Sequence, residues 1–187
     1  ASILVSMGHT AANDETATAA IEAGVRHATH LFNAMTPLNH RDPGVVGASL
    51  ADDRVSTELM ADTFHISPDL FGLVAKVKGN NLILITDCTR AGGLEDGEYT
   101  LGGQPIFVKG IECRLADGTI AGSVLKLNNA IRNMRDHTSL PLEQIVRMAS
   151  INAARCIGLD KTKGSLEAGK DADIILADEN FAVSETI

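Results

Sequence analysis

Two histidines and one aspartate of this chain, His9, His30 and Asp87, stand directly after short apolar runs. Neutral imidazoles can hold a divalent cation and leave one coordination position open for water. Such a cation lowers the pKa of the water and polarises a scissile carbonyl group. A carboxylate beside that water can accept its proton and later deliver it to a departing amine. The pattern therefore predicts a metal-dependent hydrolase centre, with His9 and His30 as metal ligands and Asp87 as the acid/base.

The runs that precede these residues are predicted to be buried strands. Residues 2–7, 25–29 and 82–86 do not alternate between apolar and polar positions, which is typical of parallel strands covered on both faces. Asn13 can cap a helix between the first two strands, and Gly24 can end it, which gives a strand–helix–strand unit. Because α/β barrels present reactive residues at the C-terminal ends of their strands, we expect a barrel of this kind.

The rest of the chain changes character along its length. Residues 34–49 contain two prolines and two glycines and are expected to form a functional loop. The glycine-rich residues 92–122 predict antiparallel hairpins, with Asp117-Gly118 as a turn. The other predicted elements are a strand at 55–60, helices at 68–78, 123–135, 141–150 and 152–157, and a last strand that ends near residue 177.

The composition sets the broad class of protein. With 44% hydrophobic and 21% charged residues, the chain has the composition of an ordinary soluble globular protein. A net charge of −8 argues against non-specific binding to nucleic acid, which needs a basic surface. No apolar run approaches the roughly 20 residues of a membrane span, and three widely spaced cysteines favour free thiols in a reducing compartment. We therefore expect a cytoplasmic protein with no nucleic-acid or membrane partner.

The length indicates part of a larger protein. A complete eight-stranded barrel needs roughly 250 residues, whereas this chain has 187. The first predicted strand begins at once, at residue 2, and a buried strand needs neighbours on both sides. We therefore expect the chain to be a fragment.

Further polar side chains follow the predicted strands. Asn33 and Arg41 lie on the loop after the second strand. The guanidinium group of arginine is well suited to bind a phosphate or a carboxylate through two parallel hydrogen bonds. The alternative interpretation of Arg41 is a solvated charge on a loop. His65 follows the strand at 55–60 and could donate a hydrogen bond to a ligand, whereas His27 is expected to face the interior of its strand.

Taken together, the motifs of the chain resemble the N-acetylglucosamine-6-phosphate deacetylases of the amidohydrolase superfamily. The resemblance extends from the first residues to about residue 178. The motifs that carry it are Gly8-His9-Thr10, the segment at residues 28–35, Arg41-Asp42-Pro43-Gly44, Ala61-Asp62 with His65, Thr86-Asp87, the segments at residues 117–123 and 148–154, and the tail at residues 164–173.

The resemblance implies the C-terminal portion of a TIM-like (β/α)8 barrel. Residues 1–160 would form the partial barrel, with a β-hairpin insertion near 92–122, and residues 161–187 would return to a small β-sandwich. It also implies the roles of individual residues. His9 and His30 would bind the metal and Asp87 would be the catalytic acid/base. The residues implied to contact the substrate are Asn33, Ala34, Arg41 for the phosphate, His65 for the sugar, and Ile120, Ala121 and Gly122 around the pocket.

The activity implied is the hydrolysis of N-acetylglucosamine 6-phosphate to glucosamine 6-phosphate and acetate. Its cofactor would be a divalent metal ion, with Zn²⁺ expected and Fe, Co, Mn or Ni as alternatives, because ligand type alone does not decide the metal. In this family Arg41 and His65 can serve the site of the neighbouring subunit, which implies a homodimer.

Two alternatives remain open at this point. Another amidohydrolase, such as a D-aminoacylase or a dihydroorotase-like enzyme, would share the two histidines and the aspartate but not the loop with Asn33, Ala34 and Arg41. The chain could instead be a catalytically inactive fragment. The family takes a further metal-binding Glu from an earlier strand, and the resemblance begins immediately before His9.

The chain departs from the pattern of the family at three places. Thr63 stands where a glycine is usual before the substrate-binding histidine, and Cys88 stands where a small alanine is common. Lys126 and Leu127 replace a more usual Thr-Met pair. We expect Cys88 to be tolerated as a small hydrophobic residue and the loop at Thr63 to be altered without the loss of His65.

Overall fold

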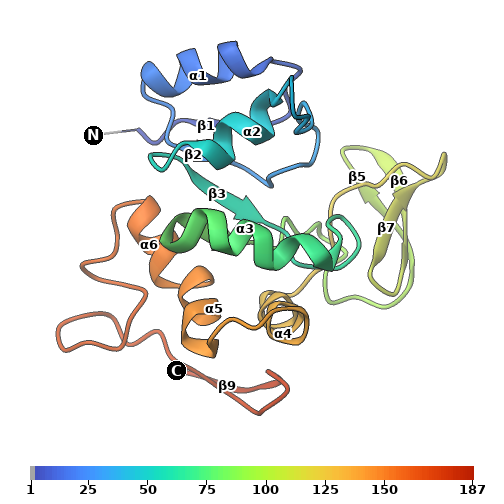
Figure 1. Ribbon diagram of the computed structural model, residues 1–187. Coiled ribbons are helices and arrows are strands. Elements are labelled where there is room, and N and C mark those ends of the chain that lie inside the picture. Colours follow the sequence, from blue (N-terminus) through green and yellow to red (C-terminus); the bar gives the residue numbers. More distant parts are fainter. Residues whose placement is uncertain (1–2) are drawn as a thin grey trace.

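A four-stranded parallel sheet forms the centre of the structure, a computed structural model that describes residues 3–187 (Figure 1). The strands are neighbours in the order β1-β2-β3-β4. Ser6 of β1 pairs with His27 of β2, and His27 pairs with Ser56 of β3. Because all four strands run in the same direction, their carboxyl ends meet at one edge of the sheet. The strands are β1 (Ser6–Met7), β2 (His27–Ala28), β3 (Ser56–Leu59) and β4 (Leu82–Leu84).

Helices alternate with these strands and bury their apolar sides against the sheet. Asn13 caps the first helix, as predicted, because its side-chain oxygen accepts the backbone N–H of Thr16 at 2.9 Å. Ile21 and Phe71 from the helices and Leu59 from the sheet are among the fully buried side chains of the main core. The helical elements here are α1 (Asp14–Glu22), α2 (Gly44–Ala51), η1 (Pro68–Leu70), α3 (Phe71–Lys78) and η2 (Gly79–Asn81).

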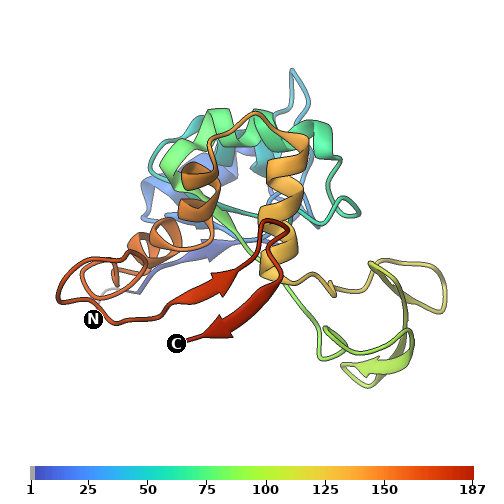
Figure 2. The same cartoon turned by 90° about the horizontal axis from the view of Figure 1, so that it is seen from below.

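A second sheet projects from one side of the molecule (Figures 1 and 2). Its three strands are antiparallel and pair in the order β5-β6-β7, which confirms the hairpins predicted for residues 92–122. Ile106, Cys113 and Ala121 belong to a small core of its own, separate from the main core. The strands are β5 (Gly97–Leu101), β6 (Gln104–Lys109) and β7 (Glu112–Leu115).

Three helices and a two-stranded ribbon complete the chain. They are α4 (Leu127–His137), α5 (Leu142–Met148), α6 (Ile151–Cys156), β8 (Ile175–Ala177) and β9 (Val183–Thr186). The first of these helices begins four residues later than predicted, and the other two lie where they were expected. Within residues 3–187 no helix is both long and apolar enough to cross a membrane. The assignment of residues 161–187 to a β-sandwich domain stays a prediction.

The prediction of a loop at residues 34–49 is wrong for the second half of this segment, which forms α2. Pro43 stands at the N-cap of this helix, where a missing N–H breaks no helical hydrogen bond. A Cβ atom at Gly47 would lie 2.4 Å from the Cβ of Pro43, so the glycine permits close packing. At the other end, the Lys78 ammonium donates to the Ser49 carbonyl at 2.8 Å. Proline and glycine here mark a tightly packed helix start and not an irregular backbone.

β1 is shorter and more exposed than predicted, and Ser2, where the predicted strand begins, lies outside the described residues. Ile3, Leu4 and Val5 are 85%, 39% and 48% exposed. β1 stands at the edge of its sheet, and no other strand of residues 3–187 lies on its outer side. Within residues 3–187 β1 thus has a neighbouring strand on one side only, and its burial on both sides stays a prediction for the whole protein. For β2 and β4, whose residues are all buried, the prediction is confirmed.

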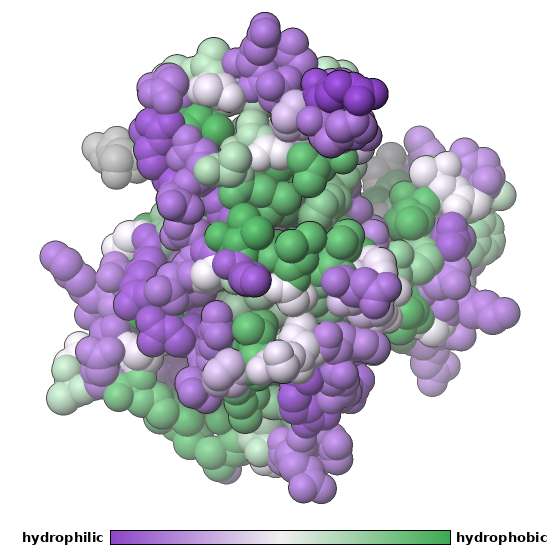
Figure 3. Space-filling view, in the orientation of Figure 1, coloured by the Kyte–Doolittle hydropathy of each residue, from purple (hydrophilic) through white to green (hydrophobic). Residues whose placement is uncertain are grey.

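An apolar surface lies over α2 and α3 on the face seen in Figure 3. Leu73 and Val77 of α3 are 53% and 42% exposed and lie one turn apart on the same side of the helix. Val74 and Ala75 face the core and are buried. α3 is therefore apolar on its outer side as well as on the side that packs against the core.

Candidate active site

The residues that follow three of the parallel strands adopt a left-handed backbone conformation. The angle φ is +46° at His9, +28° at His30 and +47° at Asp87. Residues with a Cβ atom disfavour this region by roughly 1–2 kcal/mol, and such strain clusters at functional sites, where the surrounding structure holds it in place. The chain thus turns sharply at each of the three residues that were predicted to carry the chemistry.

The imidazole rings of His9 and His30 lie edge to face, with their centroids 4.8 Å apart. His9 is exposed, whereas His30 is buried, and its Nδ1 has no hydrogen-bond partner among residues 3–187. A buried polar atom normally has such a partner. Two adjacent imidazoles, one with an unpartnered nitrogen, fit the histidine part of a divalent metal site. Residues 3–187 contain no group of three or more His, Cys, Asp or Glu side chains placed to hold a metal, so the pair would supply only part of the coordination.

The close approach of the two histidines depends on Gly8. A Cβ atom at this position would lie 2.2 Å from the Cγ2 atom of Thr29, well inside van der Waals contact. The Thr29 hydroxyl donates to the carboxylate of Glu58 at 2.7 Å, so the Thr29 side chain is not free to rotate away. Gly8 therefore allows the carboxyl ends of β1 and β2 to lie side by side.

The carboxylate of Glu58, on β3, connects the three strands β1, β2 and β3. One oxygen accepts the Thr29 hydroxyl and the backbone N–H of His30, the latter at 3.2 Å. The other oxygen lies 3.3 Å from the Nε2 of His27, whose Nδ1 is 2.8 Å from the hydroxyl oxygen of Ser6. Burial raises the pKa of Glu58, but the hydrogen bonds from its three partners outweigh burial and leave the pKa below its ordinary value. Glu58 is therefore ionised at neutral pH.

Asp62 organises the loop after β3 and orients His65. Its carboxylate accepts the backbone N–H groups of Phe64 at 2.9 Å and of His65 at 2.8 Å, and it also bonds the Nδ1 of the His65 ring. Burial raises the pKa of Asp62, but these hydrogen bonds lower it by more, so the pKa lies below its ordinary value. The His65 ring is thereby fixed through Nδ1, and Nε2 remains as its second hydrogen-bonding atom.

Thr63 holds the backbone conformation that a glycine would favour. Its φ is +65°, and a β-branched residue is a rare occupant of this region. The backbone of the loop therefore keeps the conformation that glycine would adopt, and the threonine that replaces glycine here holds a strained φ angle. The expectation that His65 is retained is consistent with the bonds that hold its backbone and ring.

The segment after His30 folds back toward His9. The backbone and side-chain amides of Asn33 both donate to the His30 carbonyl, each at 3.1 Å. The Ala34 carbonyl accepts the backbone N–H of Thr10 at 3.0 Å, which places Ala34 beside the residue that follows His9. Arg41 is exposed and forms no salt bridge within the described part of the chain, so its guanidinium is available to a ligand.

The residues predicted to surround the pocket lie beside Asp87. The backbone N–H of Ser123 donates to the Asp87 carbonyl at 3.2 Å, and a Cβ atom at Gly122 would lie 3.9 Å from the same carbonyl oxygen. Ala121 is buried, whereas Ile120 is 40% exposed. Asp87 itself is exposed. It stands at the same sheet edge as the two histidines, two strands along from β2.

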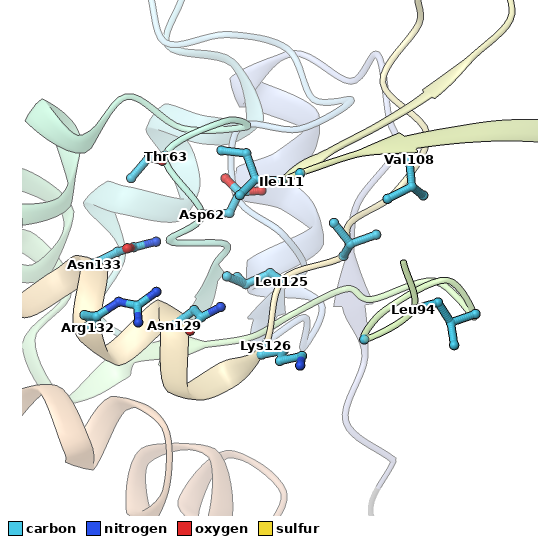
Figure 4. Close-up of a pocket in the computed structure, with 13 residues that line it drawn as sticks. Asp62, Thr63, Leu94, Val108, Ile111, Leu125, Lys126, Asn129, Arg132 and Asn133 are labelled. Carbon is cyan, nitrogen blue, oxygen red and sulfur yellow. The ribbon is translucent and has the colours of Figure 1, made fainter. Parts of the chain in front are cut away.

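A cavity of about 290 Å³ lies between the β5–β7 sheet and α4 (Figure 4). Asp62 and Thr63 are on one wall, and the cationic side chains of Lys126 and Arg132 are on another. Among the residues described, neither the two histidines nor Asp87 lines this cavity. The cavity is therefore a separate feature from the pair of imidazoles.

Two carboxylates of this region, Glu58 and Asp62, were not predicted to have a role. A signal for Glu58 was present, because an ionisable residue in the middle of a short strand is unusual in a parallel sheet. Asp62 appeared in the sequence only as part of a motif. Its function as the anchor of His65 follows from the local turn between Asp62 and His65, which no periodicity in the sequence reveals.

The chain is similar to known proteins along its whole length. A model described as the amidohydrolase family matches residues 1–187. The N-acetylglucosamine-6-phosphate deacetylase of Bacillus subtilis (strain 168) is 46% identical over 100% of this chain and 47% of its own length. The N-acetylgalactosamine-6-phosphate deacetylase of Escherichia coli O157:H7 is 39% identical over 98% of this chain and 48% of its own length. The chain thus spans about half the length of the curated relatives it matches.

A solved structure extends the likeness to the fold. The crystal structure of N-acetylglucosamine-6-phosphate deacetylase from Pasteurella multocida matches with a TM-score of 0.95 at 35% identity, over 99% of this chain and 49% of that one. The predicted fold class, part of a TIM-like α/β barrel with added antiparallel strands, is confirmed.

Gly8→Ala is expected to lower the free energy of unfolding by about 1–3 kcal/mol, because an added methyl group in a packed region forces its neighbours to shift. Thr29→Ser removes the methyl group that clashes and keeps the hydroxyl that donates to Glu58. The double variant Gly8→Ala/Thr29→Ser should therefore recover most of the lost stability. Urea unfolding of wild type, both single variants and the double variant measures this. A double variant no more stable than Gly8→Ala would contradict the steric explanation.

Thr63→Gly is expected to raise the free energy of unfolding by about 1 kcal/mol, because glycine adopts the left-handed region without strain. Thr100→Gly serves as the control. Thr100 lies in β5, where glycine weakens a strand, so this variant should be less stable than wild type. Thermal unfolding of both variants tests the prediction, and a loss of stability in Thr63→Gly would show that the threonine side chain makes a compensating contact.

Proposed function

This chain belongs to the amidohydrolase family, and from that membership we propose that its protein hydrolyses the acetamide of N-acetylglucosamine 6-phosphate to glucosamine 6-phosphate and acetate. The observation that carries the proposal is the pair of imidazoles whose centroids lie 4.8 Å apart, at the sheet edge where Asp87 also stands. The relative from Bacillus subtilis, which is named for this activity, supports the choice of substrate. Because the chain spans about half of that relative, the activity is proposed for the whole protein.

Asp87 is the proposed acid/base of the reaction. Its backbone carbonyl is held by the Ser123 N–H, while its side chain is exposed. In the proposed reaction the carboxylate accepts a proton from the attacking water and then delivers it to the nitrogen of the departing amine. A strained backbone at this residue supports a fixed direction for that proton transfer.

His9 and His30 are the proposed metal ligands. When bound, a divalent ion would polarise the acetyl carbonyl and lower the pKa of the attacking water. Zn²⁺ is the ion we propose, and Fe, Co, Mn and Ni remain alternatives, because imidazole ligands suit several of these metals. The two histidines hold their relative positions through Gly8 and through the bonds around the His30 peptide.

The substrate is proposed to bind through its phosphate at one end and its sugar ring in the middle. Arg41, an exposed cation, would pair with the phosphate. Asn33 and Ala34 would contact the substrate from the segment that folds back toward His9, and His65 would bond the sugar through Nε2. Ile120 to Gly122 would line the pocket beside Asp87. Remote contacts of this kind align the reacting amide and so lower the barrier.

A second substrate has a specific observation in its favour. The relative from Escherichia coli O157:H7 is named for N-acetylgalactosamine 6-phosphate and is 39% identical to this chain. The two sugars differ in the configuration of one ring hydroxyl, so the same acetamide chemistry and phosphate contact would serve both. The ratio of kcat/KM for the two sugar phosphates decides between them, and we expect it to favour the glucosamine form.

We also propose that the protein is a cytoplasmic homodimer. The resemblance of the sequence implies that Arg41 and His65 can reach the site of a neighbouring subunit, and the exposure of Arg41 is compatible with such a contact. Light scattering on the purified protein measures the oligomeric state, and a monomer at micromolar concentration would contradict the dimer.

Asp87→Asn is expected to lower kcat for acetate release from N-acetylglucosamine 6-phosphate by about 10²- to 10⁴-fold, because an amide cannot accept and return the proton. The bound metal should remain, since Asp87 is not one of the two proposed imidazole ligands. Asp69→Asn, a change at an exposed residue of η1, is the control and should retain full activity. Wild-type turnover by Asp87→Asn would rule out this assignment.

Arg41→Gln is expected to raise KM for N-acetylglucosamine 6-phosphate at least about tenfold, since a charge-assisted hydrogen bond to phosphate is lost. Hydrolysis of unphosphorylated N-acetylglucosamine should change little. Arg147→Gln, on the exposed side of α5, removes the same charge elsewhere and is the matched control. An equal loss on both sugars would mean that Arg41 does not recognise the phosphate.

A further inference from the structure

A chain of polar contacts runs through three neighbouring strands of the sheet. It starts at the hydroxyl of Ser6 on β1, passes the imidazole of His27 on β2 at 2.8 Å, and reaches the carboxylate of Glu58 on β3 at 3.3 Å. His27 is 7% exposed, and the side chain of Glu58 is 20% exposed. An ionised carboxylate at such a position needs several hydrogen bonds to be stable. The contact with His27 supplies one of these hydrogen bonds.

The second oxygen of Glu58 makes the contacts that concern the site. It accepts the Thr29 hydroxyl at 2.7 Å and the backbone N–H of His30 at 3.2 Å. The peptide that it holds is the one at which the backbone turns into the left-handed region, with φ of +28° at His30. The carboxylate is therefore bonded to the strained peptide that sets the direction of the His30 side chain.

We propose that Glu58 is a positioning residue for the metal ligand His30. The proposal rests on the proposed function in one respect, namely that His9 and His30 bind a metal ion. Glu58 itself would not touch the metal or the substrate. It would keep the His30 peptide in its left-handed turn, so that the imidazole stays beside that of His9. Outer contacts that orient a ligating histidine are known to set metal affinity.

The arrangement of neighbours favours this role over that of a simple ion pair. A pair with His27 would need only one of the two carboxylate oxygens, yet the other oxygen binds two donors that both belong to the Thr29-His30 segment. Gly8 packs against the methyl group of the same threonine. The segment is thus held from β1 by this packing and by the bond from the Thr29 N–H to the Met7 carbonyl at 3.0 Å, and from β3 by the hydrogen bonds to Glu58.

Glu58→Gln and Glu58→Ala separate positioning from charge. In Glu58→Gln the side-chain oxygen can still accept from Thr29 and His30. Its amide N–H can donate to the Nε2 of His27, provided that the proton of this ring moves to Nδ1 and is donated to Ser6. Glu58→Ala removes all of these acceptors. Glu98→Ala, on the exposed strand β5, removes the same charge away from the site and is the control.

The measurement is the affinity of the protein that contains this chain for Zn²⁺, obtained by competition with a coloured chelator. The visible absorption spectrum of the Co²⁺-loaded protein is recorded beside it, and circular dichroism checks the fold. Glu58→Ala should bind Zn²⁺ about 10- to 100-fold more weakly and shift the Co²⁺ bands, whereas Glu58→Gln and Glu98→Ala should stay close to wild type. Thr29→Val, which removes one donor and keeps the shape of the side chain, should give a smaller loss.

The outcomes separate the failure of this inference from that of the proposed function. If wild type binds Zn²⁺ and Glu58→Ala binds it equally well with an unchanged Co²⁺ spectrum, the positioning role is overturned. If Glu58→Ala does not fold, unchanged affinity in Thr29→Val overturns it instead. If Glu58→Gln is as weak as Glu58→Ala, the charge and not the hydrogen-bond geometry matters, which also contradicts the proposal. Wild-type protein that binds no Zn²⁺ would overturn the proposed metal site itself.

Discussion

The contact between Gly8 and Thr29 is the constraint on which the site depends. With 2.2 Å between the Thr29 methyl group and the place where a Cβ atom at Gly8 would stand, only glycine lets the ends of β1 and β2 meet. The register of the parallel strands then brings His9 and His30 to the same edge, and the left-handed turns at both residues direct the rings toward each other. The two imidazoles are therefore adjacent because of backbone packing, with no direct bond between them.

The strands and hairpins could largely be predicted because their signals are local. Continuous apolar runs marked β2 and β4, and the glycine-rich segment with Asp117-Gly118 marked the β5–β7 sheet. α2 could not be predicted, because Pro43 and Gly47 indicate a loop in sequence, and only the packing of the two residues against each other shows that they serve a helix.

In the candidate site, too, the features that depend on nearby residues could be predicted, and those that depend on distant residues could not. His9, His30 and Asp87 could be identified because each follows a strand, and position at a strand end is a local property. Glu58 was missed because its partners Thr29 and His30 follow another strand, β2, 29 and 28 residues earlier in the chain. Thr63 could be recognised as a departure, but its conformation depends on Asp62, which bonds both following N–H groups and so fixes the turn. For Glu58 the sequence lacks the identity of the tertiary partner, and for Thr63 it lacks the geometry of the local turn.

The central claim is that His9 and His30 together hold one divalent metal ion. Anomalous X-ray diffraction at the zinc edge, on crystals of the protein grown with Zn²⁺, tests it most directly. We predict a single strong peak between the two rings, about 2.0–2.1 Å from one nitrogen of each imidazole. A peak bound by other residues and by neither ring, or crystals in which both rings are ordered but no peak lies between them, would contradict the claim.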